Sequence, residues 1–401
     1  MNKDIKISYA KTVYGEREIE AVVKCLREST QMGNYSRQFE KKIANLFDKK
    51  YCLYVNSGSS ALYIGIEALD FKKNSEVITP ALTFSTSVGC LIKNKLVPVF
   101  VDVEPLTFCI DSSRVENMIT ERTVAILAPN LMGNLCNWPI LKEIASKYNL
   151  LLIEDSADTL GATIDGKSSG FFTDMSITSF YGSHIINCAG NGGALMVNNK
   201  KVLDKSKLLR SWGRSSSLFD EKSEKIENRF DIKLDGVDYD AKFVFETVGY
   251  NLEGSEIGSA FGLVQLENLN NNIKTRRDNF KKQTEFFKKY RDFFETPEEL
   301  SNVFTGWLAF PVLLKNNTPF SRKEFQIYLE KNNIQTRVVF TGNILRQPMC
   351  KDINKVIDRL GYHNSDNVMK NGVLLPLHHG MTDEMFEYFW SKIDIFMKKY
   401  I

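Results

Sequence analysis

The chain has 401 residues, 43% of them hydrophobic, which is enough to bury a large core in two domains or in one domain with an appendage. Its 52 basic and 49 acidic residues give a net charge of +3, too balanced for a nucleic-acid binder. The sequence has no recognisable signal peptide and no apolar run of the roughly 20 residues that cross a bilayer, and its seven scattered cysteines fit reduced thiols. We therefore expect a cytoplasmic protein that binds neither nucleic acid nor membrane.

Helix and strand patterns alternate over the first half of the chain. Apolar residues at helical spacing predict helices over 16–28 and 37–47. Short β-rich runs follow, with helical patterns between most of them, at 51–55, 77–79, 97–103, 124–128, 150–154, 176–181 and 193–197. This alternation predicts an α/β fold whose mostly parallel central sheet carries helices on both faces.

We predict a large domain over 1–254, which contains an insertion, followed by a connecting helix and a small C-terminal domain. Residues 215–247 are polar, rich in charge and without a clean period, which indicates a long insertion or active-site flap. One long connecting helix is predicted over 255–290. Residues 291–401 are predicted as a small C-terminal α+β domain, with strands near 307–314 and 334–340 and helices over 322–331 and from Asp383.

A run of small residues lies between a predicted strand and an apolar helix, at Asn56-Ser57-Gly58-Ser59-Ser60-Ala61. Backbone N–H groups there can approach an anion, and the N-terminus of the helix adds favourable electrostatics. An ordinary turn with a serine cap explains the same run. Taken alone, this run favours the ordinary turn.

Two further strand ends carry polar side chains. The strand before Asp155 and Asp158 ends in acids, and open α/β sheets bind ligands at the carboxyl ends of their strands. Acids that cap the next helix are an equally good interpretation. Farther on, Ser179 ends a strand five residues before His184, and the glycine-rich residues 190–193 indicate a tight turn. A lone histidine is more often structural than catalytic.

The order of these motifs resembles the DegT/DnrJ/EryC1/StrS family of sugar aminotransferases, which are fold-type I pyridoxal-phosphate (PLP) enzymes with an aspartate aminotransferase-like fold. The resemblance covers nearly the whole chain, through SGSSAL at 57–62, TPALTFST at 79–86, IEDSAD at 153–158, SFxxxH at 179–184 and GYNLEG at 249–254. Ordinary members have SFxxxK, whose lysine forms a Schiff base. His184 at that place resembles the 3-dehydrases of nucleotide-linked 4-keto-6-deoxyhexoses.

The resemblance implies which residues hold the phosphate of PLP or of pyridoxamine phosphate (PMP). Gly58, Ser59 and Ser179 are expected to bind it within one subunit. Asn251 is expected to reach the phosphate of the neighbouring subunit, which implies a homodimer with shared active sites. The resemblance does not decide whether arginines such as Arg337 and Arg346 contact a nucleotide diphosphate or form surface ion pairs.

The resemblance also implies roles around the pyridine ring. Phe84 is expected to stack on the ring, and Asp155 to pair with the protonated ring nitrogen. Asp158 matches a position near the cofactor hydroxyl. His184 is expected to act as the base, since an imidazole can transfer protons near neutral pH. No metal site is expected.

These roles predict PMP/PLP-dependent dehydration at C3 of a nucleotide-linked 4-keto-6-deoxyhexose in deoxysugar biosynthesis, that is, a lyase. An amino donor such as glutamate is expected to recharge the cofactor. Relatives that carry an iron–sulfur cluster have several cysteines after a segment like 210–214, whereas residues 215–247 here contain none. This difference argues against a cluster of that type, which needs several thiolates.

Three alternatives stay open. The chain could be an iron–sulfur CDP-4-keto-6-deoxyglucose 3-dehydrase coupled to a reductase, with thiolates from elsewhere, for example Cys136 and Cys188. It could be a nucleotide-sugar aminotransferase that tolerates histidine, which the mass of the product would reveal. It could also be a non-catalytic relative that binds sugar nucleotides, and failure to bind PLP or PMP would favour that reading.

Overall fold

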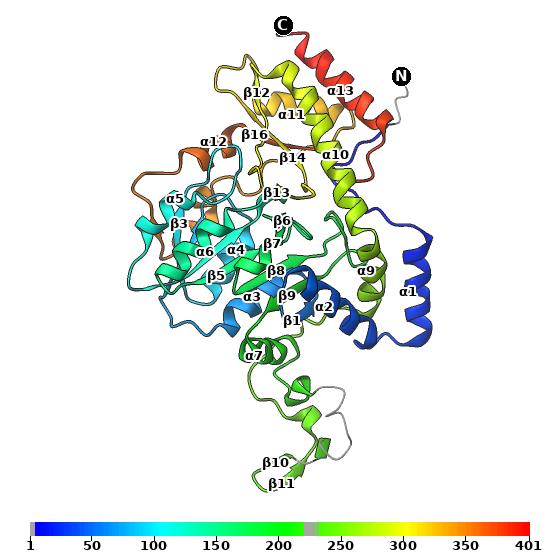
Figure 1. Cartoon of the computed structure of the whole chain (residues 1–401), viewed down its shortest axis with the longest axis vertical. Coiled ribbons are helices and arrows are strands. Elements are labelled where there is room, and N and C mark those ends of the chain that lie inside the picture. The colour runs from blue at the N-terminus through cyan, green and yellow to red at the C-terminus, as the bar shows by residue number, and fades with distance from the viewer. Residues whose placement is uncertain (1–4, 220–228, 231) are drawn as a thin grey trace.

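The structure is a computed structural model that describes residues 5–219, 229–230 and 232–401. At its centre lies an eight-stranded sheet of order β1-β9-β8-β5-β4-β2-β3-β15 (Figure 1). Strand β9 runs antiparallel to both of its neighbours, and the other pairs are parallel. The strands are β1 (Tyr51–Val55), β2 (Glu76–Pro80), β3 (Val97–Val101), β4 (Thr123–Pro129), β5 (Leu151–Asp155), β8 (Met175–Ser179), β9 (Gly193–Val197) and β15 (Val356–Ile357). The predicted mostly parallel sheet is thus confirmed.

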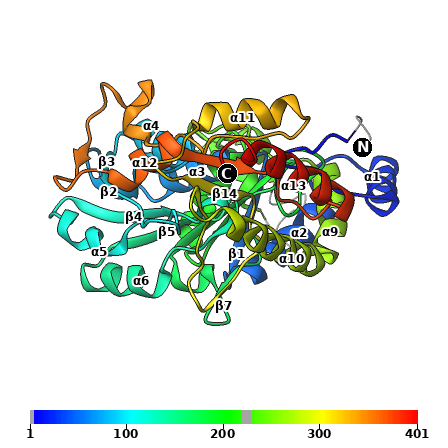
Figure 2. The ribbon, with the colours of Figure 1, turned by 90° about the horizontal axis from the view of Figure 1, so that it is seen from above.

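Helices cover both faces of this sheet, because successive side chains of a strand point to opposite sides. On β1, Leu53 and Val55 belong to the core beneath α3, while Tyr54 packs with α2. Figure 2 shows α3 and α4 on the opposite side of the strands from α5 and α6. The helices are α2 (Asn34–Leu46), α3 (Gly58–Ala68), α4 (Ser85–Lys93), α5 (Ser112–Val115), α6 (Trp138–Lys147) and α7 (Lys200–Arg210).

The C-terminal part forms a smaller antiparallel sheet of β12 (Phe294–Glu295), β14 (Phe310–Leu314) and β16 (Gly372–Leu375). Its apolar core is largely aromatic, and helices α11 (Arg322–Lys331), α12 (His363–Asn371) and α13 (Asp383–Met397) pack around it. Two segments tie this part to the large sheet. Strand β15 pairs with β3, and β13 (Val303–Phe304) pairs with β6 (Thr163–Ile164), which in turn pairs with β7 (Lys167–Ser168).

Two predicted elements are wrong. The single helix over 255–290 is two helices, α9 (Glu256–Glu267) and α10 (Leu269–Phe287), separated at Asn268. Helix α9 packs on α1 (Glu16–Glu28) and α2, and the first turns of α10 stay in the core beside α2 through Leu269 and Ile273. The later apolar side chains of α10 enter the core of the C-terminal sheet. The strand expected over 334–340 is reduced to isolated bridges, Ile7 with Ile334 and Arg337 with Leu374.

The polar insertion projects away from the small C-terminal sheet. Its described part contains the hairpin of β10 (Ile232–Leu234) and β11 (Val237–Tyr239), at the opposite end of the molecule in Figure 1. Residues 220–228 and 231 lie outside the described residues. None of the insertion's described residues lines the pocket of its own chain, so a flap over that pocket is not observed. Among the described helices, none is both long and apolar enough to span a membrane.

Candidate active site

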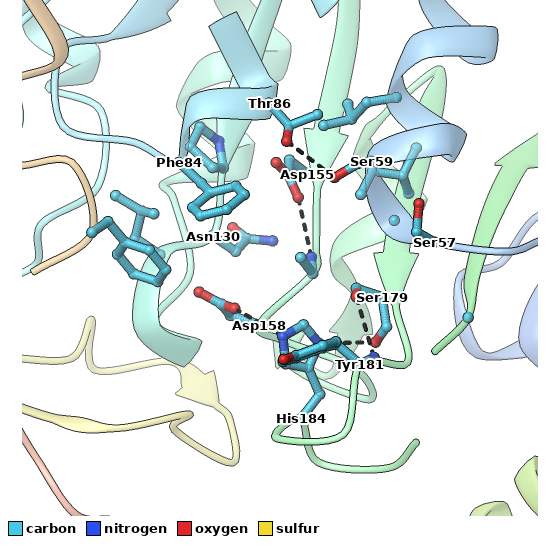
Figure 3. A pocket seen from close by; sticks show the side chains of 18 of the residues that line it. Ser57, Ser59, Phe84, Thr86, Asn130, Asp155, Asp158, Ser179, Tyr181 and His184 are labelled. Atoms are coloured by element: carbon cyan, nitrogen blue, oxygen red, sulfur yellow. Dashed lines mark hydrogen bonds and ion pairs between the residues drawn. The ribbon is translucent and has the colours of Figure 1, made fainter. Parts of the chain in front are cut away.

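A pocket of about 340 Å³ opens where β4, β5 and β8 end and where α3 and α4 begin (Figure 3). The parallel strands bring their carboxyl ends to one edge of the sheet, which is where ligands bind in open α/β folds. The turns that follow these strands therefore supply most of the lining. Its residues are Ser57, Gly58, Ser59, Leu62, Phe84, Thr86, Pro129, Asn130, Leu131, Asp155, Ala157, Asp158, Ile177, Ser179, Tyr181, His184, Asn191, Gly192 and Phe340.

One end of the pocket is an anion cradle at the N-terminus of α3. Ser57 caps this helix, because its hydroxyl accepts a hydrogen bond from the backbone N–H of Ser60 at 3.1 Å. A Cβ atom at Gly58 would lie 2.8 Å from the Cβ of Ser179, so glycine allows the helix to begin directly against β8. The hydroxyl of Ser59 lies 3.0 Å from that of Thr86. Unpaired N–H groups, hydroxyls and the helix dipole together fit a phosphate.

Asp155 lines the same pocket from the end of β5. The hydroxyl of Ser87 donates to its Oδ2 at 2.8 Å, and the backbone N–H of Ala157 donates to its Oδ1 at 3.2 Å. Burial raises the pKa of Asp155, while these two hydrogen bonds oppose that rise. Its carboxylate has no ion-pair partner among the described residues, and a buried acid in this state fits a protonated ring nitrogen as its partner.

His184 is held in one orientation. Its Nδ1 lies 3.0 Å from the carbonyl oxygen of Ser179, and because a carbonyl only accepts, Nδ1 carries the hydrogen. The Nε2 lone pair of the neutral ring then faces Asp158, whose Oδ1 is 3.9 Å away (Figure 3). Burial, helped by the positive charge of Arg276 and opposed by the hydrogen bond to Ser179, lowers the pKa of His184 to about 4. At neutral pH the imidazole is therefore an uncharged base.

Asp158 has a different environment from Asp155. Its Oδ2 accepts a hydrogen bond of 2.9 Å from the backbone N–H of Met132. Burial raises its pKa to about 7, against that hydrogen bond and with the help of the nearby Asp155 charge. Asp158 is thus poised between its two protonation states near neutral pH, beside the Nε2 atom of His184.

Aromatic rings border the pocket. Phe84, at the N-cap of α4, is 50% exposed, and its ring meets Phe340 edge to face at 6.3 Å. Tyr181 is 58% exposed, with its ring centre 6.2 Å from that of His184. Such exposed rings beside a polar pocket offer flat surfaces on which another ring can stack.

The structure brings together all but one of the predicted site residues. Gly58, Ser59, Phe84, Asp155, Asp158, Ser179 and His184 line this pocket. Asn251 is the exception: it is exposed and forms a bridge with Ser211 elsewhere. Of the two arginines that the sequence leaves undecided, Arg346 pairs with Asp366 at 2.8 Å, and neither lines the pocket. The individual catalytic and binding roles stay predictions.

Sequence reasoning missed several lining residues. Asn130 directly follows β4, and the rule that identified Asp155 at the end of β5 applies equally there. Its side chain donates to the buried Glu154 at 2.9 Å and accepts from the indole N–H of Trp138 at 3.0 Å. Phe340 carried no local signal, because it reaches the pocket from a loop of the C-terminal part.

The structure does not assemble the cysteine pair considered for an iron–sulfur cluster. Cys136 belongs to the core under α6, whereas Cys188 belongs to a separate core with Tyr54 and the buried side chains of α2. In the part of the chain that the structure describes, no three His, Cys, Asp or Glu side chains gather as a metal site.

Comparison with known proteins decides the family. The pattern of the "DegT/DnrJ/EryC1/StrS aminotransferase family" matches residues 13–394. This chain belongs to that family. The lipopolysaccharide biosynthesis protein RfbH of Salmonella typhimurium is 33% identical to it, over 96% of this chain and 90% of that protein.

Other members of the family carry names for different reactions. A dTDP-4-dehydro-2,6-dideoxy-D-glucose 3-dehydratase of Saccharopolyspora spinosa is 32% identical over 92% of this chain and 81% of its own. A GDP-perosamine synthase of Caulobacter vibrioides is 28% identical over 94% of this chain and 95% of its own. The family therefore contains both dehydratases and aminating enzymes at similar distance from this chain.

The fold matches a solved structure of the same family. The GDP-4-keto-6-deoxy-D-mannose-3-dehydratase of E. coli, with bound hydrated PLP, superposes with a TM-score of 0.86 at 28% identity, covering 97% of this chain and all of that chain. The predicted fold-type I architecture is confirmed. The structure of that enzyme contains bound PLP.

Proposed function

We propose that this chain is a PLP/PMP-dependent enzyme of nucleotide-sugar metabolism that removes the C3 hydroxyl from a nucleotide-linked 4-keto-6-deoxyhexose in deoxysugar biosynthesis. The observation that carries the proposal is His184. An oriented, uncharged imidazole lies in a pocket with a candidate phosphate cradle and a buried acid. The family resemblance implies a lysine amine at this position in ordinary aminating members. The 3-dehydratases among its relatives support the same reaction.

The pocket residues would hold the cofactor at both ends. The N-terminus of α3 would bind the phosphate together with Ser59 and Ser179, and Asp155 would keep the ring nitrogen protonated. Phe84 would cover one face of the ring. When bound, the cofactor supplies an amine that condenses with the sugar ketone and a ring that accepts electrons.

His184 would move the proton on which dehydration depends. Its Nε2 lone pair is free to accept a proton, since Nδ1–H is bound to the Ser179 carbonyl. Because burial makes the imidazolium unfavourable, the protonated ring is a strong acid that can return its proton to the departing C3 hydroxyl, which leaves as water. Asp158, 3.9 Å from Nε2, would steady the charged ring between these two transfers.

The overall reaction balances with an amino donor and without an iron–sulfur cluster. With glutamate, the products are a 3-deoxy-4-keto sugar, ammonia and 2-oxoglutarate. The two electrons that remove the oxygen come from the donor, so no external reductase is required. The lining of the pocket contains no lysine among the residues that the structure describes, which disfavours the covalent return of an amino sugar that defines aminotransferases.

The test is turnover of a panel of CDP-, GDP-, dTDP- and UDP-linked 4-keto-6-deoxyhexoses with PLP and glutamate, read by mass spectrometry. We expect a product that is one oxygen lighter than its substrate. Replacing His184 with Asn should lower this turnover by about 10²–10⁴-fold, because a positioned base contributes that much, and should leave the absorbance of bound cofactor in place. A product that keeps every hydroxyl and gains an amine would instead establish an aminotransferase.

A further inference from the structure

Arg276 is a buried cation that the proposed reaction does not use. It lies on α10, and its side chain has no exposed surface. Buried charges are costly unless they are paired, yet Arg276 forms no salt bridge with any carboxylate that the structure describes. Its guanidinium instead donates to oxygens of Trp307, Leu308, Leu377 and His184 and to a nitrogen of His379.

We propose that Arg276 is a positioning residue for His184: it fixes the loop that carries the base to the C-terminal part of the molecule and sets a permanent positive charge behind the imidazole. The inference rests on the proposed function only in taking His184 as the base.

The hydrogen bonds of Arg276 converge from segments far apart in the sequence. One terminal nitrogen donates to the carbonyls of Trp307, Leu308 and Leu377 at 3.1, 3.1 and 3.2 Å, and Nε donates to Nδ1 of His379 at 3.1 Å. These groups precede β14 and follow β16, the central and an outer strand of the C-terminal sheet. The planar fork of arginine suits this arrangement because several of its donors are fixed in one plane.

The other terminal nitrogen of Arg276 contacts the backbone of His184. It lies 3.5 Å from the carbonyl oxygen of His184. One helical turn earlier on α10, Asn272 donates to the carbonyl of the next loop residue, Ile185, at 3.2 Å. Two side chains of one helix thus hold consecutive residues of the catalytic loop, and the position of His184 follows the position of α10.

Among the groups that the structure describes, Arg276 carries the positive charge that acts on the His184 imidazole. Asp158 and Asp155 face the site from β5 and its following turn, and Tyr181 and Tyr9 from the loop of His184 and the N-terminal segment. His378 and His379 follow β16. Burial raises the pKa of both acids and of Tyr9, and it lowers the pKa of both histidines to about 3. Tyr9 and the two histidines are therefore uncharged around neutrality.

The sign of the effect follows from these groups. A fixed positive charge disfavours the imidazolium and keeps the pKa of His184 low. Asp158 takes up its proton at about pH 7, above the titration of His184, so its charge is absent when the imidazole titrates. Removing the Arg276 charge should therefore raise the pKa of His184. As the pH falls, the neutral imidazole should then take up its proton at a higher pH than in the unsubstituted protein.

The experiment is a pH titration of ¹³C-labelled histidine by NMR in Arg276→Gln and in the unsubstituted protein, without substrate. The chain has four histidines. The resonance that is missing from the spectrum of His184→Asn belongs to His184. We expect the His184 titration to move up by roughly one pH unit in Arg276→Gln, and the acidic limb of kcat/KM to move with it. An unchanged His184 titration in folded Arg276→Gln would overturn the charge effect.

Arg276→Lys separates the effect of the charge from the effect of the hydrogen bonds. It is also the variant to measure if Arg276→Gln does not fold. Lysine keeps the charge but cannot bind all the carbonyls, so we expect the His184 titration to stay and kcat to fall about tenfold with little change in KM. Unchanged kcat would overturn the positioning effect. The matched control is Arg277→Gln, whose neighbouring guanidinium instead contacts Glu299 and the Thr305 carbonyl; its His184 titration should not move. Because the titration needs no turnover, a shifted resonance with no dehydration would refute the proposed function and leave this inference standing.

Discussion

His184 lines the pocket, at the position where the family resemblance predicts a lysine in ordinary members. The structure gives this residue a defined state: Nδ1–H is bound to the Ser179 carbonyl, and Nε2 is free beside Asp158. Because an imidazole cannot form a Schiff base, the proposed cofactor would be held by non-covalent contacts alone. The cradle at α3 and Asp155 would then supply the binding that a covalent link would otherwise provide.

Replacing His184 with Lys should restore that covalent link. The side chain starts inside the pocket lining, so a lysine there reaches the same space as the imidazole. We expect borohydride to trap one cofactor per chain, visible as an increase in intact mass, and dehydration to be lost. His184→Asn is the control, since an amide forms no such link. If the lysine variant gave no adduct after reduction, residue 184 would not lie beside the cofactor.

At the scale of elements, the site depends on how tightly α3 begins against β8. Gly58 permits this contact, and Ser57 with Ser60 closes the first turn of the helix. The turn therefore has both of the properties that the sequence left as alternatives: it is a serine-capped helix start, and its free N–H groups face the pocket.

Gly58→Ala should weaken cofactor binding. The added Cβ would lie 2.8 Å from the Cβ of Ser179, so the helix N-terminus must move away from the phosphate position. We expect a PLP dissociation constant about tenfold higher, a loss of about 1.4 kcal/mol, measured by absorbance or fluorescence titration. The control is Gly15→Ala, whose new Cβ has 4.0 Å to its nearest neighbour and lies at the start of α1. Equal affinity in Gly58→Ala would mean that α3 does not bind the phosphate.

At the scale of the whole molecule, the site is not complete in one chain if the prediction for Asn251 holds. Asn251 is exposed and outside the pocket, and aromatic side chains near it are exposed as well: Trp212 by 36%, Phe245 by 54% and Tyr250 by 47%. Clustered exposed aromatic residues are typical of a surface that another protein covers. A second copy of the chain is the partner that the family resemblance predicts.

A hybrid dimer tests this arrangement. Co-expressed His184→Asn and Asn251→Ala chains should form hybrids in which one site has both native residues. We expect the mixture to recover about a quarter of the unsubstituted activity per chain, because half of randomly paired dimers are hybrids and half of their sites are intact. Each variant by itself is the control. If Asn251 acted within its own chain, every site in the hybrid would lack one residue, and no activity would return.

The sequence by itself determined the parts of this protein that depend on local pattern. Short β-rich runs identified strands β1 to β5, β8 and β9 to within about two residues, but not the short strands β6 and β7. Motif order identified Gly58, Asp155 and Ser179, which lie at the start of a helix or the end of a strand, and His184, which lies in the loop after β8.

Only the tertiary structure decided features that join distant segments. Helix α9 ends at Glu267, and α10 then runs from the core beside α2 into the core of the C-terminal sheet. Phe340 lines the pocket, and Arg276 contacts the carbonyl of His184, which is 92 residues away in the sequence. No local sequence pattern predicts either contact. The protonation states of His184 and Asp158 belong to the same class, because they are set by burial and by charges that folding brings near.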